Sequence, residues 1–320
     1  MCIVIWPDWP WPSPPPPAPA PADHLVCWPE ALPLGMPRID PKVLNCALYL
    51  YPSTEAAATG EKAGGSGFVA GVPSTADPKN VFYPYAVTNR HVIEDARATV
   101  VRLNTAADDF DILDIDPRLW VKHPNGDDVA ACALKLADTH KVSFVSTRLF
   151  LTKEQATTWV GVGDDVFTVG RFKNLEERNQ KNRPVARFGN IAMMPGDAIR
   201  QQTGHAQVSY LIECHSMSGL SGSPVFVDVG SAGGPVIQFL GVVWGHVPDA
   251  QPVSKGGEEH PEGWVVKGNS GMMGVVPAWM LRELLDEPRF RDVRQEGDAL
   301  LAKEKGVGGL EATPSRLRAP

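Results

Sequence analysis

Short apolar segments separated by turn-forming residues recur along the chain from about residue 43 to residue 286. β-Branched and aromatic residues fill these segments, and Gly, Pro, Asn and Asp cluster between them, which is the pattern of strands on a half-buried sheet. The pattern predicts strands at Gly67–Gly71, Val81–Thr88, Ala98–Leu103, Asp128–Leu134, Asp165–Val169, Gln207–Glu213, Pro224–Val229, Val236–Trp244 and Met272–Val276. The fold class is therefore predicted to be all-β, either a sandwich or a barrel.

Two stretches have the spacing of a helix. One is a short turn directly after Asn89, and the other is Pro277–Glu287, which opens on a proline and carries an apolar face. The residues that follow are charged and rich in glycine, so residues 288–320 are expected to form a flexible tail.

The first 41 residues differ in composition from the rest of the chain. They hold 13 of its 30 prolines and four of its nine tryptophans. A run such as Pro14–Pro17 neither continues a helix nor donates hydrogen bonds to a sheet, so residues 1–41 are predicted to be a polyproline-like or disordered extension. Ile3–Trp6 is too short for the apolar region of a signal peptide. The alternatives are a ligand for a proline-binding domain and a translation start at Met36.

Charge and cysteine usage narrow the classes of function. The 30 basic and 37 acidic residues give a net charge of −7, and the basic residues form no cluster. Nucleic acids and anionic membranes both attract a positive surface, so neither is expected as a partner. No apolar run approaches the roughly 18 residues of a membrane-spanning helix. The five cysteines are scattered without the spacing of a zinc site, which predicts a reduced, cytoplasmic protein without metal or cofactor.

Three segments carry residues that are typical of catalysis. In the first, His91 follows a strand end, and an imidazole can take and return a proton near neutral pH. A histidine in this position is, by itself, more often an ordinary surface residue. In the second, Asp127 and Asp128 precede an apolar strand, where a carboxylate can orient a base by accepting its ring N–H. Asp128 is favoured because it adjoins the apolar residues, whereas Asp127 belongs to a turn.

The third segment, Ser218–Phe226, places a serine between glycines ahead of a proline and a strand. This arrangement lets backbone amides converge on a developing oxyanion, and Gly219 and Ser221 are the natural donors. Gly222 is expected to leave room for a substrate. A polar hairpin loop is the alternative interpretation of this segment.

Together the three segments resemble the trypsin-like (chymotrypsin-fold) serine peptidases, most closely the bacterial HtrA/DegP catalytic domain. The segments fall in the family's order, and base, acid, nucleophile is an order that α/β-hydrolases and subtilisins do not share. The matching segments are Gly65–Phe68 for G-[ST]-G-F, Val87–Val92 for T-x-x-H-V, Asp128–Ala130 for D-[IV]-A, Gly163–Val166 with Gly170 for the strand that opens the second barrel, Gly219–Pro224 for G-x-S-G-[GS]-P and Gly274–Pro277 for the closing strand.

The resemblance implies two six-stranded antiparallel β-barrels, over residues 42–150 and 151–287, with a C-terminal helix and a cleft between the barrels. It also implies a serine endopeptidase in which His91, Asp128 and Ser221 form a catalytic triad and act through an acyl-enzyme. In this arrangement the backbone amides of Gly219 and Ser221 form the oxyanion hole.

The resemblance further implies where the substrate binds. Val243, Trp244, Gly245 and His246 match the edge strand that pairs with the substrate backbone, although Val243 replaces a serine whose hydroxyl touches the catalytic aspartate in many members. His215 matches the floor of the P1 pocket. Together with His246 it points to an acidic or amide P1 side chain, and two exposed histidines are the alternative.

A competing hypothesis is a catalytically silent scaffold that holds a peptide or protein partner in the cleft. Under either hypothesis the partner is a peptide or a protein, and the oligomeric state is left open. A PDZ-like domain has no room in the 33 residues after Glu287, so the assembly of HtrA proteins is not implied.

Overall fold

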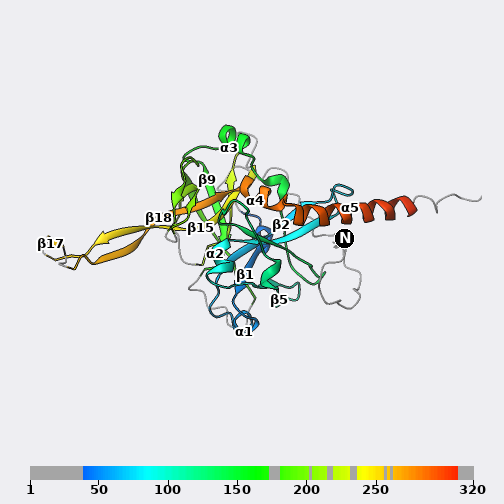
Figure 1. Cartoon of the computed structure of the whole chain (residues 1–320), viewed down its shortest axis with the longest axis horizontal. Coiled ribbons are helices and arrows are strands. Elements are labelled where there is room, and N and C mark those ends of the chain that lie inside the picture. The colour runs from blue at the N-terminus through cyan, green and yellow to red at the C-terminus, as the bar shows by residue number, and fades with distance from the viewer. Residues whose placement is uncertain are drawn as a thin grey trace, which may run out of the picture.

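The computed structural model describes residues 39–172, 181–201, 204–214, 219–230, 236–255, 258–259 and 262–308. This part of the chain is mostly β-structure with helices at its C-terminal end, as the sequence predicts (Figure 1). The predicted N-terminal extension lies outside the described residues up to residue 38. No helix in the described ranges is both long and apolar enough to cross a bilayer.

The strands between residues 47 and 146 form one sheet, which we call the N-terminal sheet. Its strand order is β5-β4-β1-β2-β3-β7-β6, and β8 pairs with β2 in parallel. The strands are β1 (Ala47–Tyr51), β2 (Gly65–Pro73), β3 (Phe82–Thr88), β4 (Val100–Asn104), β5 (Phe110–Asp114), β6 (Val121–Lys122), β7 (Ala130–Ala133) and β8 (Val145–Ser146). Within the described residues no ladder joins β5 to β6, so this half is an eight-stranded sheet rather than the six-stranded barrel that was expected.

Six of the strands between residues 165 and 277 form a closed barrel, which confirms the expectation for this half. The order around the barrel is β10-β13-β18-β15-β14-β9. The strands are β9 (Asp165–Gly170), β10 (Val185–Met193), β13 (Tyr210–Glu213), β14 (Pro224–Asp228), β15 (Ile237–Pro252) and β18 (Val265–Pro277). β15 and β18 continue beyond the barrel as a two-stranded ribbon that projects from the body (Figure 1).

Shorter elements complete the fold. Two hairpins are β11 (Ile199–Arg200) with β12 (Ala206–Gln207), and β16 (Ser254–Lys255) with β17 (Glu258–Glu259). The helices are α1 (Thr54–Thr59), α2 (Arg90–Glu94), α3 (Lys153–Trp159), α4 (Ala278–Leu285) and α5 (Pro288–Gly308), and single 3₁₀ turns lie at Pro41–Cys46, Pro117–Leu119 and Thr147–Leu149.

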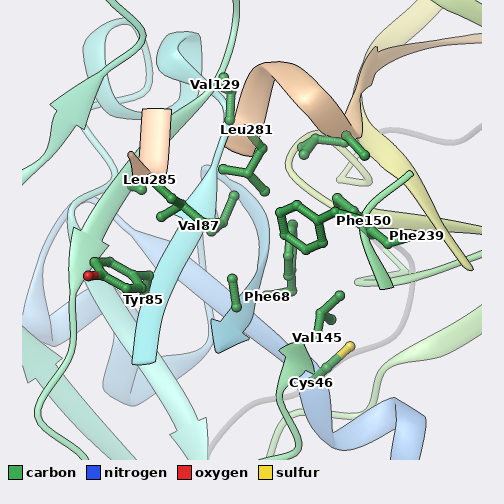
Figure 2. Close-up of a cluster of buried hydrophobic side chains, with 14 of the residues drawn as sticks. Cys46, Phe68, Tyr85, Val87, Val129, Val145, Phe150, Phe239, Leu281 and Leu285 are labelled. Carbon is green, nitrogen blue, oxygen red and sulfur yellow. The ribbon is translucent and has the colours of Figure 1, made fainter. Parts of the chain in front are cut away.

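One hydrophobic cluster joins the N-terminal sheet to the barrel (Figure 2). The ring of Phe239 on β15 lies 5.3 Å from that of Phe68 on β2 and 4.5 Å from that of Phe150, centroid to centroid. Leu281 and Leu285 of α4 pack into the same cluster. Because burying apolar surface stabilises the folded state, this shared core fixes the two halves against each other.

Residues 288–308 form helix α5, so the flexible tail predicted to begin at residue 288 is wrong for this stretch. Phe290, Arg294 and Asp298 recur at four-residue spacing and therefore lie on one face. Phe290 is fully buried edge-on against Tyr85, with ring centroids 4.9 Å apart, and Arg294 Nη1 donates to the Tyr85 hydroxyl at 2.9 Å. Two of the three anchoring residues are charged, which hides the pattern from a search for apolar periodicity.

Candidate active site

His91 and Asp128 meet at the end of β3. Helix α2 begins directly after this strand, and His91 Nδ1 lies 2.7 Å from Asp128 Oδ2 while the backbone N–H of His91 donates to Oδ1 at 3.1 Å. The Asp128 side chain is 5% exposed and that of His91 is 28% exposed. A carboxylate at Nδ1 holds the ring proton there and leaves Nε2 as the basic nitrogen. The pair therefore has the geometry of an oriented general base.

The backbone around Asp128 is held from both sides. Its N–H donates to the fully buried Gln207 at Oε1, 2.8 Å, and its carbonyl accepts from Asn89 Nδ2 at 2.7 Å. Asn89 is two residues before His91, so one side chain ties the base segment to the acid segment. A carboxylate taken out of water needs such a fixed polar environment.

The neighbouring Asp127 turns away from His91. Its Oδ2 lies 2.9 Å from Nδ1 of the buried His123, and Gln207 Nε2 donates to its Oδ1 at 2.8 Å. The hydrogen bond with His123 holds the pKa of Asp127 below its ordinary value. Of the two adjacent carboxylates, Asp128 contacts the base and Asp127 has a structural role.

Ser221 lies in the loop between β13 and β14, and this loop rests on the N-terminal sheet. The N–H of Ser66 on β2 donates to the carbonyl of Ser221 at 2.9 Å, and the Ser66 hydroxyl donates to the carbonyl of Gly219 at 2.6 Å. Ser66 is fully buried. The loop that carries the serine is thus shaped by a residue of the other half of the molecule.

Gly222 faces this contact and not the substrate side that the sequence suggested. Its φ is +87°, and a Cβ at this position would lie 2.0 Å from the carbonyl oxygen of Ser66 and 2.4 Å from Thr88 Oγ1. Both the left-handed backbone and the close approach require glycine. The glycine therefore makes room for the N-terminal sheet.

The amides of Gly219 and Ser221 make no hydrogen bond to another described residue. Gly219 has a φ of +104°, again in the left-handed region. Among the described residues neither amide donates to another group, whereas the next two, Gly222 and Ser223, donate to Val243 and Leu220. Two amide donors of one loop without another described partner suit an oxyanion.

The structure brings Ser221 close to the His91 segment without a hydrogen bond between the two side chains. A Cβ at Gly65 would lie 2.8 Å from Val92 Cγ2 and 3.2 Å from the carbonyl oxygen of Ser221, so a single glycine separates the two segments. Within the described residues Ser221 Oγ donates to the carbonyl of Trp244 at 3.3 Å and not to His91. Catalytic hydrogen bonds are often loose in a site without substrate.

The segment predicted to pair with substrate is partly used inside the barrel. The N–H of Val243 donates to Ser223 at 2.9 Å and its carbonyl accepts from Gly222 at 2.8 Å, so the backbone of Val243 is not open to a substrate. The Trp244 ring is buried. Among the described residues, Gly245 and His246 pair with β18 and with no other strand.

His215, the predicted floor of the P1 pocket, lies outside the described residues. The pocket that adjoins the candidate residues opens instead beside His91 and Asp128, with a volume of about 220 Å³. Gln201 and His205 of the β11–β12 hairpin line it. Gln201 and Gln207 were not predicted as site residues, because neither belongs to a catalytic motif of the sequence.

Other groups with catalytic or metal-binding chemistry are few in the described part of the chain. It contains no group of three or more His, Cys, Asp or Glu side chains placed to hold a metal. Cys46 and Cys132 are buried, and burial raises the pKa of each thiol to about 12. These two thiols are therefore protonated at neutral pH, and a protonated thiol is a poor nucleophile.

No family model and no curated protein matches the chain. Among solved structures, the fold is similar to the protease domain of MamO from Magnetospirillum magneticum, with 16% identity over 77% of this chain and 99% of that chain and a TM-score of 0.47. It is also similar to the inactive form of Rv3671c from M. tuberculosis H37Rv (18% identity, 79% of this chain, 94% of that chain, TM-score 0.42).

A third structure with a similar fold is the HtrA-type protease AlgW, solved with a decapeptide (14% identity, 70% of this chain, 52% of that chain, TM-score 0.40). These matches are protease domains, the class to which the sequence is also similar. At this identity they concern the fold and assign no residue a role.

Proposed function

We propose that the chain is a serine endopeptidase in which Ser221 is the nucleophile, His91 the general base and Asp128 the residue that orients the base. The observation that carries this proposal is the 2.7 Å contact between His91 Nδ1 and the buried Asp128 carboxylate, on the segment against which the Ser221 loop packs. Nothing else in the described part of the chain pairs an oriented imidazole with a serine held between glycines.

The proposed reaction begins with rotation of the Ser221 side chain away from the Trp244 carbonyl and toward His91. The Ser221 oxygen then forms a bond to the peptide carbonyl carbon while His91 Nε2 takes the hydroxyl proton. The Gly219 and Ser221 amides stabilise the oxyanion, and His91 returns the proton to the leaving amine. Water, deprotonated by His91, then hydrolyses the acyl-enzyme.

We further infer that the N-terminal sheet has the place of the first barrel in this family, and that Gly245 and His246 offer the edge to which an extended substrate adds as a strand. His246 and His215 would then favour an acidic or amide P1 side chain. A peptide library with Glu, Gln, Phe, Arg or Leu at P1 tests this specificity, and a clear preference for Arg or Phe would refute it.

One observation favours a second function, a catalytically silent scaffold that binds a peptide or protein. The hydroxyl of Ser221 is directed to the Trp244 carbonyl, 3.3 Å away, which leaves it without its base. A chain that kept this arrangement on binding a peptide would hold the peptide without cleaving it.

Covalent labelling by a fluorophosphonate separates the two functions. Serine peptidases react because the base activates the hydroxyl, so we expect labelling of the wild type and none of Ser221→Ala. Ser143→Ala is the matched control, since Ser143 lines a different small pocket, together with Val145 and Phe226. A folded wild-type protein that is not labelled would favour the scaffold.

A further inference from the structure

The carboxylate of Asp128 has a third N–H group beside it that belongs to neither the triad nor the base segment. Oδ1 accepts from the backbone N–H of His91, and Oδ2 lies 2.7 Å from His91 Nδ1. Gln201 Nε2 also donates to Oδ2, at 3.4 Å, and Gln201 is only 8% exposed. A buried carboxylate thus has one long hydrogen bond from a side chain far away in the sequence.

The hairpin that carries Gln201 is built to hold it there. Its strands pair Ile199 with Gln207, and the N–H of Gln201 donates to the carbonyl of His205 at 2.7 Å. Gln207, at the other end of the same hairpin, accepts from the backbone N–H of Asp128. One hairpin of the C-terminal half therefore fixes both the main chain and the side chain of a carboxylate in the N-terminal half.

We infer that Gln201 is a positioning residue, which acts on the base through Asp128; this inference rests on the proposed function. Its amide shares the Oδ2 atom with the imidazole. The amide takes up part of the carboxylate's charge and restricts rotation of the carboxylate about its Cβ–Cγ bond. Without it, Asp128 would bind the imidazolium form of His91 more strongly and hold the ring less firmly.

Other charged and titratable groups surround the pair, and they are the same in every variant considered below. Arg90, Glu94 and Asp95 of α2 and His205 of the hairpin line the adjoining pocket, and Arg90 Nε lies 2.7 Å from Glu94 Oε2. Asp127 and His123 form the pair behind Asp128. A difference between variants therefore reports the change at residue 201.

The test is the rate of Ser221 labelling by a fluorophosphonate, measured from pH 5 to pH 9. In this step the Ser221 oxygen forms a bond to phosphorus, fluoride leaves, and His91 takes the hydroxyl proton, so the rate follows the fraction of neutral imidazole. Gln201→Met keeps the size of the side chain and removes the donor. We expect its midpoint to move to higher pH and its plateau rate to fall about threefold, at the lower end of what a single hydrogen bond contributes.

We expect Gln201→Lys to shift the pH midpoint of labelling in the opposite direction. Its ammonium group would pair with the carboxylate and compete with the imidazolium, so the midpoint should move to lower pH. Arg200→Ala, at an exposed position of the same hairpin, should leave midpoint and plateau as in the wild type. If Gln201 had a purely structural role, both substitutions would lower the amount of reactive protein. The pH midpoints of Gln201→Met and Gln201→Lys would then not move in opposite directions.

The outcomes separate this inference from the proposed function. A wild type that is not labelled contradicts the proposed function. If the wild type is labelled and both Gln201→Met and Gln201→Lys have its pH midpoint, the role of Gln201 is contradicted while the proposed function stands. If Gln201→Met does not fold, the midpoint of Gln201→Lys decides, and an unchanged value overturns the inference.

Discussion

The candidate catalytic groups of the two halves depend on contacts that span very different separations in the sequence. His91 and Asp128 are 37 residues apart and meet inside the N-terminal sheet, at the ends of strands that are hydrogen-bonded neighbours. The Ser221 loop belongs to the barrel, but its shape depends on Ser66, 153 residues before Gly219. His91 and Asp128 are therefore brought together by strands of one half, with Gln207 of the other half also bonded to Asp128, whereas the Ser221 loop is shaped by a contact between the two halves.

The dependence between the halves also runs in the other direction. Helix α5, which follows the barrel in the chain, packs on the N-terminal sheet through Phe290 and Tyr85. Asp298 on the same helix accepts from the Tyr83 hydroxyl at 2.8 Å and from the backbone N–H of Thr75 at 3.0 Å. Neither half is complete without chain from the other, so damage at these contacts should affect both.

The largest effect on the free energy of unfolding is expected at the contact between Gly222, in the Ser221 loop, and Ser66. Gly222→Ala would force a left-handed φ on alanine and push its Cβ to 2.0 Å from the Ser66 carbonyl. Strain and overpacking together should cost roughly 2–6 kcal/mol of unfolding free energy. Urea denaturation measures this cost. Gly161→Ala is the control because its Cβ meets no atom within 4 Å, and equal losses in both variants would argue against docking at Gly222.

Removal of the α5 anchor should have the next largest effect. Phe290→Ala leaves a cavity against Tyr85 and should lower the free energy of unfolding by about 3–5 kcal/mol. Leu300→Ala on the same helix is the control, since Leu300 is 40% exposed. Thermal unfolding compares the two. A flexible tail, as the sequence alone suggests, would make both substitutions neutral.

A smaller effect is expected from the Ser66 hydroxyl, which bridges the halves. Ser66→Ala removes the donor to the Gly219 carbonyl and the acceptor of the Arg171 N–H, at 2.6 and 2.9 Å. Leaving buried partners unsatisfied should cost about 1–3 kcal/mol. The labelling rate of Ser221 should fall as well, because the loop loses its support. Ser143→Ala provides the baseline, and a change in stability without a change in labelling would show that Ser66 does not shape the loop.

The smallest expected effect is the pH dependence of the stability that the Asp127 carboxylate contributes. Since His123 lowers the pKa of Asp127, the ionised carboxylate stabilises the fold above its ordinary pKa of about 4, and this stabilisation is lost as pH falls through the lowered value. Asp127→Asn lacks this stabilisation, so at pH 7 the free energy of unfolding of the wild type should exceed that of the variant by less than about 1 kcal/mol. This difference should decrease toward pH 3.

Urea midpoints at pH 7, 5 and 3 measure this gap, and Asp197→Asn, at an exposed position, should show none. A gap between wild type and Asp127→Asn that widened on acidification would contradict the sign of the pKa shift.

Sequence patterns located strands where one face is apolar or the whole strand is short and bounded by turns. β3, β9 and β14 were each predicted to within one residue at either end. β1, whose five residues are all buried, was missed. The ribbon of β15 and β18 was predicted too short because its outer part is exposed on both faces.

For the candidate site, the sequence supplied the residue types and their order, and the resemblance supplied their roles. The contact between His91 and Asp128 follows from the pairing of β3 with β7, which no local pattern encodes. The sequence could not predict a role for the two glutamines of the β11–β12 hairpin, because their role depends on which carboxylate they contact in the folded chain. The use of Val243 inside the barrel, against expectation, depends on how the nucleophile loop is bonded.

By itself the sequence determined that this chain is rich in β-strands, where many of them lie, and which three segments carry a base, an acid and a serine between glycines. These features are local, because strand propensity, turns and glycine conformations act over a few residues. Only the tertiary structure decided that α5 is an ordered helix, that Gly222 faces Ser66, and that Gln201 reaches Asp128. Each of these depends on contacts between distant segments, whose free energy appears only when the two halves are packed together.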